Sequence, residues 1–600
     1  MQVADHTARL TLTFFNNRFV SDSLRYGQEY IFYGAVSGDF IGYNMTNPVF
    51  EALDSAPVTT RRVLPVYPLT AGLTNAAMLR AVRQAMSICD PPAEIIPAEI
   101  RQQYGILPAH RAYDAIHEPG SMAEAELAKK RLIFEEFFIF SAGLSLMRAS
   151  RAGKRTPPFA QLDLQPFLDA LPFTLTMAQQ RAVEEIREDF RKGTPMNRLV
   201  QGDVGSGKTM VAAAAAYMAI RNGRQAALMA PTEILAEQHQ KSLSGLFAPF
   251  GITVGLLTGS MSVKEKRITR ECIAAGEIQL VVGTHALLSD TTTFSDLGLV
   301  IADEQHRFGV AQRSRLSAKG NDPHLLVMSA TPIPRTLALL MYGDLDVSIV
   351  GELPPGREPV DTFLVNESYR TRINAFIRKQ VAEGHQCFVV CPAVEENEDL
   401  GIKAATVWAE TLQKTVFPDL RIALLHGQMK GAEKEEAMAA FARGEADVMV
   451  ATTVIEVGVD VPNATLMVIE DADRFGLSQL HQLRGRVGRG KAKSYCILTS
   501  HNKNPETLQR LKALCKTTDG FKIAEEDLAL RGPGDFFGSR QSGLPTFRVA
   551  NLSYDLQTLK DAQTASASWI EQYGTSDLPE AEALRSRIGD LFLRAEGTMN

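Results

Sequence analysis

Ten short apolar runs, separated by stretches with helical character, constrain the fold of this chain more than any other feature. They form two groups of five, which divide near Pro354-Pro355-Gly356. Apolar strands that alternate with helices form parallel sheets covered on both faces. The sequence therefore predicts two tandem α/β lobes. The runs begin at Leu199, Ala226, Leu280, Leu299 and Leu325 in the first group and at Cys387, Ile422, Val448, Leu466 and Tyr495 in the second.

The regions on either side of the lobes have a different character. Apolar and polar residues alternate over residues 10–14, and residues 30–36 and 40–50 are further candidate strands. Residues 73–147 have a helical pattern that prolines interrupt. We therefore predict five domains: a β domain over 1–60, a helical linker over 61–165, lobes over 166–355 and 356–515, and C-terminal helices over 516–600.

Composition excludes several classes of protein. The chain has 63 basic and 69 acidic residues, so its net charge of −6 excludes a uniformly basic nucleic-acid binder but leaves room for a local basic groove. Six cysteines in 600 residues are too few for a disulfide framework. Cys387 and Cys391 lie in one apolar run, which favours core packing over metal binding. The longest apolar run, residues 210–220, is too short to span a bilayer, and no signal peptide is evident. We expect a cytoplasmic chain with no membrane partner.

A complete phosphate-binding loop follows the first strand of the first lobe and precedes an alanine-rich stretch. Gly202, Gly205 and Gly207 allow backbone N–H groups to surround phosphate oxygens. Lys208 supplies a positive charge to the β- and γ-phosphates, and the Thr209 hydroxyl can bind Mg²⁺. The sequence therefore predicts an ATP site that uses Mg²⁺.

Acidic and hydroxyl residues follow two later strands of the same lobe. Asp303 comes directly after a strand, where its carboxylate can hold Mg²⁺ through water. Its neighbour Glu304 can orient and deprotonate the attacking water. Ser329 and Thr331 follow the next strand and can link the ATP site to a bound nucleic-acid strand. The alternative for each pair is an ordinary polar turn.

The second lobe carries a basic segment, Gln482-Leu-Arg-Gly-Arg-Val-Gly-Arg-Gly490. A guanidinium can stabilise the charge that spreads over a transferring γ-phosphoryl group. Arg486 and Arg489 are therefore candidate arginine fingers. They would reach the nucleotide only when the two lobes close on it, which would couple hydrolysis to lobe motion.

The order of these motifs resembles that of superfamily 2 helicases. Four longer phrases, at residues 201–209, 303–309, 329–335 and 519–543, resemble the RecG family of branched-DNA helicases. The resemblance covers residues 60–600.

The resemblance implies roles for further residues. Gln179 would read adenine, and Gly458 and Asp460 would help to close the second lobe on the nucleotide. The residues that would contact DNA phosphates or link them to the ATP site are Thr232, Thr284, Thr452, Gln305 and His306, together with Ser329 and Thr331. Arg531, Arg540 and Gln541 would belong to a helical hairpin that converts lobe motion into movement along the duplex.

RecG proteins carry an N-terminal helical segment and a five-stranded OB barrel that acts as a wedge at the fork. By resemblance, this chain enters the barrel midway, and we expect a partial OB-like domain of about three strands. Phe40 and Tyr43 flank a glycine turn, where their rings can stack on unpaired bases. Core packing is the alternative for both.

The resulting hypothesis is an ATP-dependent double-stranded-DNA translocase that remodels branched DNA by fork regression and Holliday junction migration. Its expected partners are branched and duplex DNA, with a single-stranded-DNA-binding protein as a further candidate, and it is expected to act as a monomer. The alternatives are a transcription-repair-coupling translocase, an RNA helicase and an inactive DNA-binding scaffold.

Overall fold

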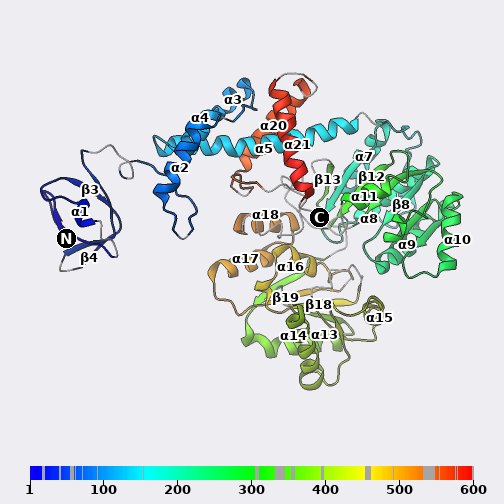
Figure 1. Cartoon of the computed structure of the whole chain (residues 1–600). Helices are drawn as coiled ribbons and strands as arrows, with labels where there is room; N and C mark the ends of the chain where they lie inside the picture. Colours follow the sequence, from blue (N-terminus) through cyan, green and yellow to red (C-terminus); the bar gives the residue numbers. More distant parts are fainter. Residues whose placement is uncertain are drawn as a thin grey trace.

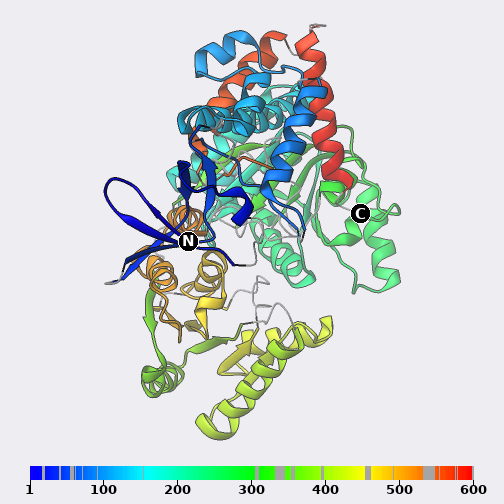
Figure 2. The ribbon, with the colours of Figure 1, turned by 60° about the vertical axis from the view of Figure 1, so that its left-hand side comes forward.

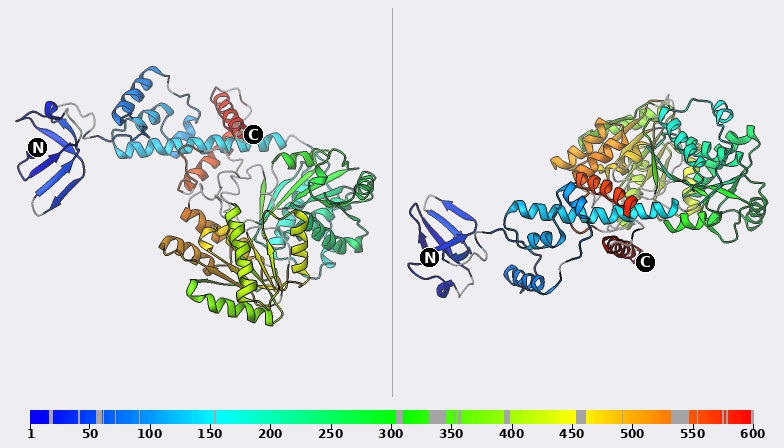
Figure 3. Two further views of the ribbon diagram at one scale, coloured as in Figure 1. Left: turned by 60° about the horizontal axis from the view of Figure 1, so that its bottom comes forward. Right: turned by 90° about the horizontal axis from the view of Figure 1, so that it is seen from above.

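The computed structural model describes the chain except for a set of short segments. These are residues 16–19, 40–41, 55–59, 61, 71, 91, 153–154, 304–309, 331–344, 353, 355–357, 393–397, 453–460, 491, 532–546, 553, 574–575, 577–578 and 598–600. An N-terminal β domain stands apart from the rest, and a helical arm follows it (Figures 1 and 3). Lobe 1 of the two α/β lobes lies at the end of the arm that is remote from the β domain, and lobe 2 lies below the arm in Figure 1.

The β domain contains more strands than the three predicted. Among its described residues, one sheet has the order β1-β2-β5-β4, and β3 pairs separately with β6. Gly34 and Ala35 separate two strands within the predicted run 30–36, and Asn47, in the left-handed region with φ 47°, separates two more within 40–50. The elements are β1 (Gln2–Ala4), β2 (Arg9–Thr13), α1 (Val20–Ser23), β3 (Tyr30–Tyr33), β4 (Val36–Asp39), β5 (Gly42–Thr46) and β6 (Val49–Ala52).

The helical arm is built around α5 (Met122–Ala152), a helix of 31 residues. Shorter helices precede it: α2 (Asn75–Ile88), α3 (Ala98–Tyr104) and α4 (Ala109–His117). The C-terminal helices α20 (Leu556–Tyr573) and α21 (Pro579–Gly597) pack against α5 (Figures 1 and 2). The helical arm and the C-terminal helices therefore share one hydrophobic core. Phe134, Phe138 and Trp569 are buried in this core.

Glu136 on α5 holds the segment that leads into α20. Its carboxylate accepts hydrogen bonds from three successive backbone N–H groups, those of Arg548 (2.9 Å), Val549 (3.0 Å) and Ala550 (2.8 Å). We call this arrangement the Glu136 clasp. It joins the arm to the chain directly after residues 532–546.

Lobe 1 is a parallel sheet with the order β13-β7-β12-β11-β8-β10-β9. All five runs predicted for this lobe are strands, and β9 and β13 are additional. The strands are β7 (Asn197–Gly202), β8 (Gln225–Met229), β9 (Val254–Leu257), β10 (Leu280–Gly283), β11 (Leu297–Ala302), β12 (His324–Ser329) and β13 (Asp346–Val350). The helices are α6 (Gln165–Asp169), α7 (Met177–Arg191), α8 (Lys208–Arg221), α9 (Glu233–Phe247), α10 (Val263–Ala274) and α11 (Val310–Ser317).

Lobe 2 is a second parallel sheet with the order β14-β19-β18-β15-β17-β16. Its strands are β14 (Asp361–Val365), β15 (Gln386–Val390), β16 (Ile422–Leu425), β17 (Val448–Ala451), β18 (Ala464–Ile469) and β19 (Tyr495–Thr499). Its helices are α13 (Arg370–Ala382), α14 (Glu398–Thr411), α15 (Gly431–Ala442) and α16 (Leu477–Arg484), and α17 (Pro505–Lys516) and α18 (Gly520–Arg531) follow. Cys387 and Cys391 are buried in its core, as predicted.

The apolar run over residues 210–220 lies within α8, whose alanines and Tyr217 are buried against the sheet of lobe 1. Small side chains let this helix pack closely against the sheet on one face and against α7 on another. Within the described part of the chain, no helix is both long and apolar enough to cross a membrane.

Candidate functional site

The phosphate-binding loop lies between the end of β7 and the start of α8. Gly205 and Gly207 have φ values of 77° and 81°, a conformation that side chains with a Cβ rarely adopt. A Cβ on Gly207 would collide with the side-chain amide nitrogen of Gln179. The backbone therefore has the tight curvature that a phosphate cradle requires.

Lys208 and Thr209 form the first turn of α8. The Lys208 ammonium donates hydrogen bonds to the carbonyl oxygens of Gly202 and Asp203, both at 2.8 Å. Both carbonyls belong to the phosphate loop, so these bonds hold the positive charge of Lys208 inside the loop. The N-terminus of α8 favours an anion at the same place.

Gln179 joins α7 to this loop. Its Oε1 accepts a hydrogen bond from the Thr176 backbone N–H (2.8 Å), and its Nε2 donates one to the Ser206 carbonyl (2.8 Å). Gln179 is only 2% exposed. The predicted adenine-reading residue therefore also positions the phosphate loop, a role that the sequence did not reveal.

Asp303 follows β11 at the same edge of the sheet as the phosphate loop. Its backbone N–H donates to the Met229 carbonyl (2.9 Å), and its Oδ2 is 2.9 Å from Nε2 of His239 on α9. The Asp303 carboxylate and the Thr209 hydroxyl supply oxygen atoms, the donors that Mg²⁺ prefers. Ser329 ends β12, the neighbouring strand, and is buried.

Several predicted site residues lie outside the described part of the chain. They are Glu304, Gln305, His306, Thr331, Gly458, Asp460, Arg540, Gln541 and Phe40. Arg531 is the last residue of α18. It is therefore the only one of the three predicted coupling residues that lies within the described part of the chain.

The arginine segment of lobe 2 lies against the phosphate loop of lobe 1. A Cβ on Gly485 would lie 2.9 Å from the Cβ of Val204, so the two loops are in close contact. Arg486 is buried, and Arg489, which is partly buried, donates from Nε to the Gly485 carbonyl (3.4 Å). The structure therefore places Gly485, which directly precedes Arg486 and whose carbonyl Arg489 contacts, at the lobe interface, and the role of the two arginines as fingers stays a prediction.

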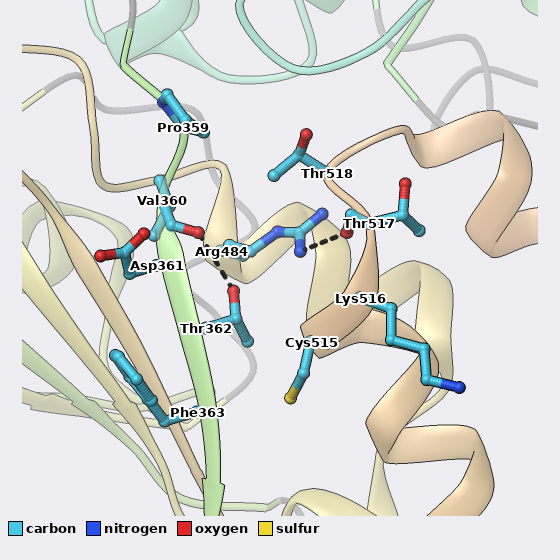
Figure 4. A pocket seen from close by; sticks show the side chains of 10 residues that line it. All are labelled: Pro359, Val360, Asp361, Thr362, Phe363, Arg484, Cys515, Lys516, Thr517 and Thr518. Carbon is cyan, nitrogen blue, oxygen red and sulfur yellow. Dashed lines mark hydrogen bonds between the residues drawn. The ribbon is translucent and has the colours of Figure 1, made fainter.

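Arg484 differs from the other two arginines. It is buried, and its Nη1 donates to the carbonyls of Leu514 (2.7 Å) and Thr517 (2.9 Å) at the end of α17. Figure 4 shows its guanidinium directed toward Thr517 along one wall of a cavity of about 420 Å³. A cation at the C-terminal end of a helix is stabilised by the helix dipole. Arg484 therefore connects α16 to α17.

One side-chain hydrogen bond crosses between the lobes at this point. His481 Nε2 on α16 is 2.5 Å from Asp203 Oδ1 in the phosphate loop. Burial alone would raise the pKa of Asp203, but the hydrogen bonds from His481 and Val204 and the charge of Lys208 outweigh it, so the pKa is lowered. The sequence analysis missed His481 because only the folded chain brings it beside Asp203.

A groove of about 550 Å³ on lobe 1 contains two of the predicted phosphate contacts, Thr232 and Thr284. Thr232 caps α9, where its hydroxyl accepts from the Leu235 N–H (3.4 Å). Lys266 and Arg270 on α10 also line the groove, and together they outweigh the acid Glu233 and give it a net positive charge. Sequence analysis missed both, although their spacing of four residues places them on one helix face.

Lobe 2 repeats part of this arrangement. The Thr452 N–H donates to the Leu425 carbonyl (3.1 Å) after β17, as the Thr284 N–H donates to the Leu257 carbonyl (3.2 Å) after β10. Lys434 donates to the Gly427 carbonyl (2.5 Å), as Lys266 does to the Gly259 carbonyl (2.5 Å). The two lobes therefore present similar hydroxyl and ammonium groups at equivalent edges of their sheets.

Tyr43 on β5 is 58% exposed, while Leu12 and Met45 form the core of the β domain. Its ring lies beside Gly38 of the neighbouring strand. This position agrees with a surface role for Tyr43 and excludes the core-packing alternative.

Family models match four parts of the chain. These are a DEAD/DEAH box helicase domain (residues 176–340), a helicase conserved C-terminal domain (370–491), a RecG wedge domain (1–89) and the C-terminal part of RecG domain 3 (517–595). The "ATP-dependent DNA helicase RecG" of Escherichia coli is 43% identical over 592 residues, which cover 95% of this chain and 85% of that protein. The chain belongs to the RecG family.

Other RecG proteins agree with this assignment. The RecG of Bacillus subtilis is 41% identical over 583 residues, which cover 96% of this chain and 85% of that protein. The Synechocystis RecG is 48% identical over 90% of this chain, which spans 66% of that longer protein. A solved structure of RecG bound to a three-way DNA junction matches with a TM-score of 0.74 at 41% identity, and the match covers 93% of this chain and 75% of that one. The predicted RecG resemblance and the two-lobe helicase fold are confirmed.

Proposed function

We propose that this RecG-family helicase uses ATP to move along double-stranded DNA and remodels branched DNA by fork regression and Holliday junction migration. The observation that carries the proposal is the contact of Gly485 in the arginine segment of lobe 2 with Val204 in the phosphate loop of lobe 1, in a chain that also has a RecG wedge domain. The likeness to RecG on a three-way junction supports branched DNA as the substrate.

The chemistry is assigned to residues at the lobe interface. Lys208 neutralises the β- and γ-phosphates, and Thr209 and Asp303 would hold Mg²⁺, which supplies charge neutralisation at the phosphates. Glu304 activates the attacking water. Arg486 and Arg489 stabilise the γ-phosphoryl group from the opposite lobe, so hydrolysis requires docked lobes.

DNA is held mainly through phosphates. Thr232 and Thr284 on lobe 1 and Thr452 on lobe 2 contact one strand, and Lys266, Arg270 and Lys434 add positive charge. Phosphate contacts carry no sequence information, which suits movement along any DNA. Gln305, His306, Ser329 and Thr331 relay strand binding to the ATP site.

Regions outside the lobes convert this motion into remodelling. Arg531, Arg540 and Gln541 transmit lobe movement to the duplex, and Phe40 and Tyr43 of the β domain stack on bases at the branch point. The protein acts as a monomer, and a single-stranded-DNA-binding protein is a further partner.

An ATPase and unwinding assay with no DNA, linear duplex and forked DNA tests the proposal. Fork-stimulated hydrolysis and fork unwinding are expected from the native chain. Lys208→Ala and Glu304→Gln should each retain less than about 1% of the turnover, a loss of roughly 2.7 kcal/mol of transition-state stabilisation. ATP hydrolysis without any effect on forked DNA would contradict the assigned substrate, and a chain without ATPase activity would be a scaffold.

A further inference from the structure

Asp203 is an acidic residue inside a loop that must surround an anion. It follows Gly202 directly, and its backbone carbonyl already accepts a hydrogen bond from Lys208. A carboxylate this close to a triphosphate opposes binding unless it is directed away and hydrogen-bonded. The loop therefore needs a partner for Asp203, and the partner comes from the other lobe.

The Asp203 carboxylate is held in one orientation. Its Oδ1 accepts from the Val204 N–H (2.7 Å) within the loop and lies 2.5 Å from His481 Nε2 in lobe 2. The His481 side chain is 4% exposed and that of Asp203 is 16% exposed, so water contributes little to this contact. The contact also lies beside the packing of Gly485 on Val204, where the lobes meet.

Arg484 determines which nitrogen of His481 carries the proton. Arg484 Nη2 is 2.7 Å from His481 Nδ1, and a guanidinium can only donate hydrogen bonds. Nδ1 therefore accepts, and the proton is on Nε2, from which it is donated to Asp203. The carbonyls of Leu514 and Thr517 hold Arg484 in turn, and Figure 4 shows the bond to Thr517. Lobe 2 therefore fixes both the orientation and the tautomer of His481.

We propose that His481 is a positioning residue of the ATP site. From lobe 2 it holds the Asp203 carboxylate away from the phosphates, so the loop binds nucleotide tightly only while the lobes are docked. By thermodynamic reciprocity, bound nucleotide then favours docked lobes to the same degree. The inference rests on nucleotide binding at the phosphate loop, which Lys208→Ala tests separately.

Equilibrium titration of the full chain with a fluorescent ATP analogue, without DNA, tests the proposal. His481→Ala should weaken affinity about tenfold, which corresponds to about 1.4 kcal/mol. His481→Gln should stay within about threefold of the native affinity, because its carbonyl can accept from Arg484 and its amide can donate to Asp203. Ser478→Ala is the matched control, since this hydroxyl on the same helix makes no hydrogen bond to the described residues.

A second substitution separates positioning from a general loss of structure. Asp203→Asn introduced into His481→Ala should recover most of the lost affinity, because it removes the unpaired negative charge. Native affinity in His481→Ala, equal losses in the Ala and Gln variants, or a further loss on adding Asp203→Asn would each overturn the inference. Loss of binding in Lys208→Ala together with native affinity in His481→Ala would show that the ATP site is correct and the role of His481 is not. Retained binding in Lys208→Ala would instead contradict the ATP site itself.

Discussion

Arg484, Arg486 and Arg489 lie within six residues of one another, yet their surroundings differ. Arg484 is hydrogen-bonded to two carbonyls at the end of α17, whereas Arg486 is buried directly after Gly485, which contacts lobe 1, and Arg489 donates to the Gly485 carbonyl. The sequence allowed the selection of the latter two as arginine fingers, because the motif is distinctive. The sequence could not reveal the role of Arg484, since every residue has a backbone carbonyl and only the fold determines which carbonyls an arginine reaches.

Substitution should separate these roles. Arg489→Ala should lower kcat by at least roughly a hundredfold with little change in nucleotide affinity, because its charge is needed in the transition state. Arg484→Ala should instead destabilise the fold by roughly 2–4 kcal/mol, since it leaves buried carbonyls unpaired. Steady-state kinetics and thermal unfolding measure the two effects. A rise in KM alone for Arg489→Ala would make that residue a ground-state binder.

His239 and His481 show the limit of motif reading at the residue scale. Each contacts an acid that lies within a recognised motif, Asp303 or Asp203, from a helix far away in the chain. No residue spacing predicts such contacts, because they depend on how helices and lobes pack. Gln179 is the intermediate case: its motif was recognised, but its bond to Ser206 was not.

At the scale of elements, the strands of both lobes were predictable because fully buried strands are continuous apolar runs. The edge strands β9, β13 and β14 were not predicted, since residues such as Gly255, Ser348 and Asp361 interrupt their apolar pattern. In the β domain, turns at Gly34 and Asn47 divided what looked like single strands. Short strands in a small domain carry too little pattern to show such divisions.

Helix α18 contains an acidic residue whose titration should be visible in stability. Burial raises the pKa of Asp527 to about 6, although Arg510 and the Leu477 N–H oppose this. Between pH 3.8 and about 6 the folded chain keeps a proton that the unfolded chain has lost, so this residue's contribution to stability falls as pH rises through that window. Above pH 6 the free-energy cost of burying the ionised Asp527 carboxylate approaches about 3 kcal/mol.

Asp527→Asn should therefore raise the unfolding temperature at pH 7.5 and change it little at pH 4. The unfolding temperatures of the variant and the native chain must be compared at each pH. Burial lowers the pKa of His324 to about 4, so this residue destabilises the fold of both chains as pH falls. An equal effect of Asp527→Asn at both pH values would contradict the raised pKa.

The Glu136 clasp gives a second prediction about elements. Glu136→Gln replaces one carboxylate oxygen with an amide that cannot accept the N–H groups it faces. The segment around Arg548–Ala550 should then exchange its amide hydrogens at least roughly tenfold faster, a factor that corresponds to about 1.4 kcal/mol. DNA-stimulated ATPase should stay within about twofold, since the phosphate loop is not involved. Unchanged exchange would mean that the packing of α20 on α5 is sufficient to hold this segment.

At the scale of the whole molecule, the motor residues all lie in the two lobes, while the β domain stands apart from them (Figure 3). A chain without residues 1–60 should therefore keep ATPase activity with linear duplex within about twofold. It should lose the preference for forked over linear DNA, because no rigid surface remains at the branch point. ATPase rates with the two DNAs measure this. A retained fork preference would place junction recognition in the lobes or the arm.

The length of α5 has a mechanical consequence. Its 31 residues span roughly 46 Å, since a helix rises about 1.5 Å per residue, and its packing against α20 and α21 stiffens it. A lever of that length needs to tilt by only about four degrees to displace its far end by about 3.4 Å, the rise of one base pair. This is the N-terminal end of α5, away from lobe 1, and the β domain lies beyond it (Figure 1). Small rotations of a lobe can therefore be amplified, at the β-domain end of the arm, to a displacement equal to the step of the double helix.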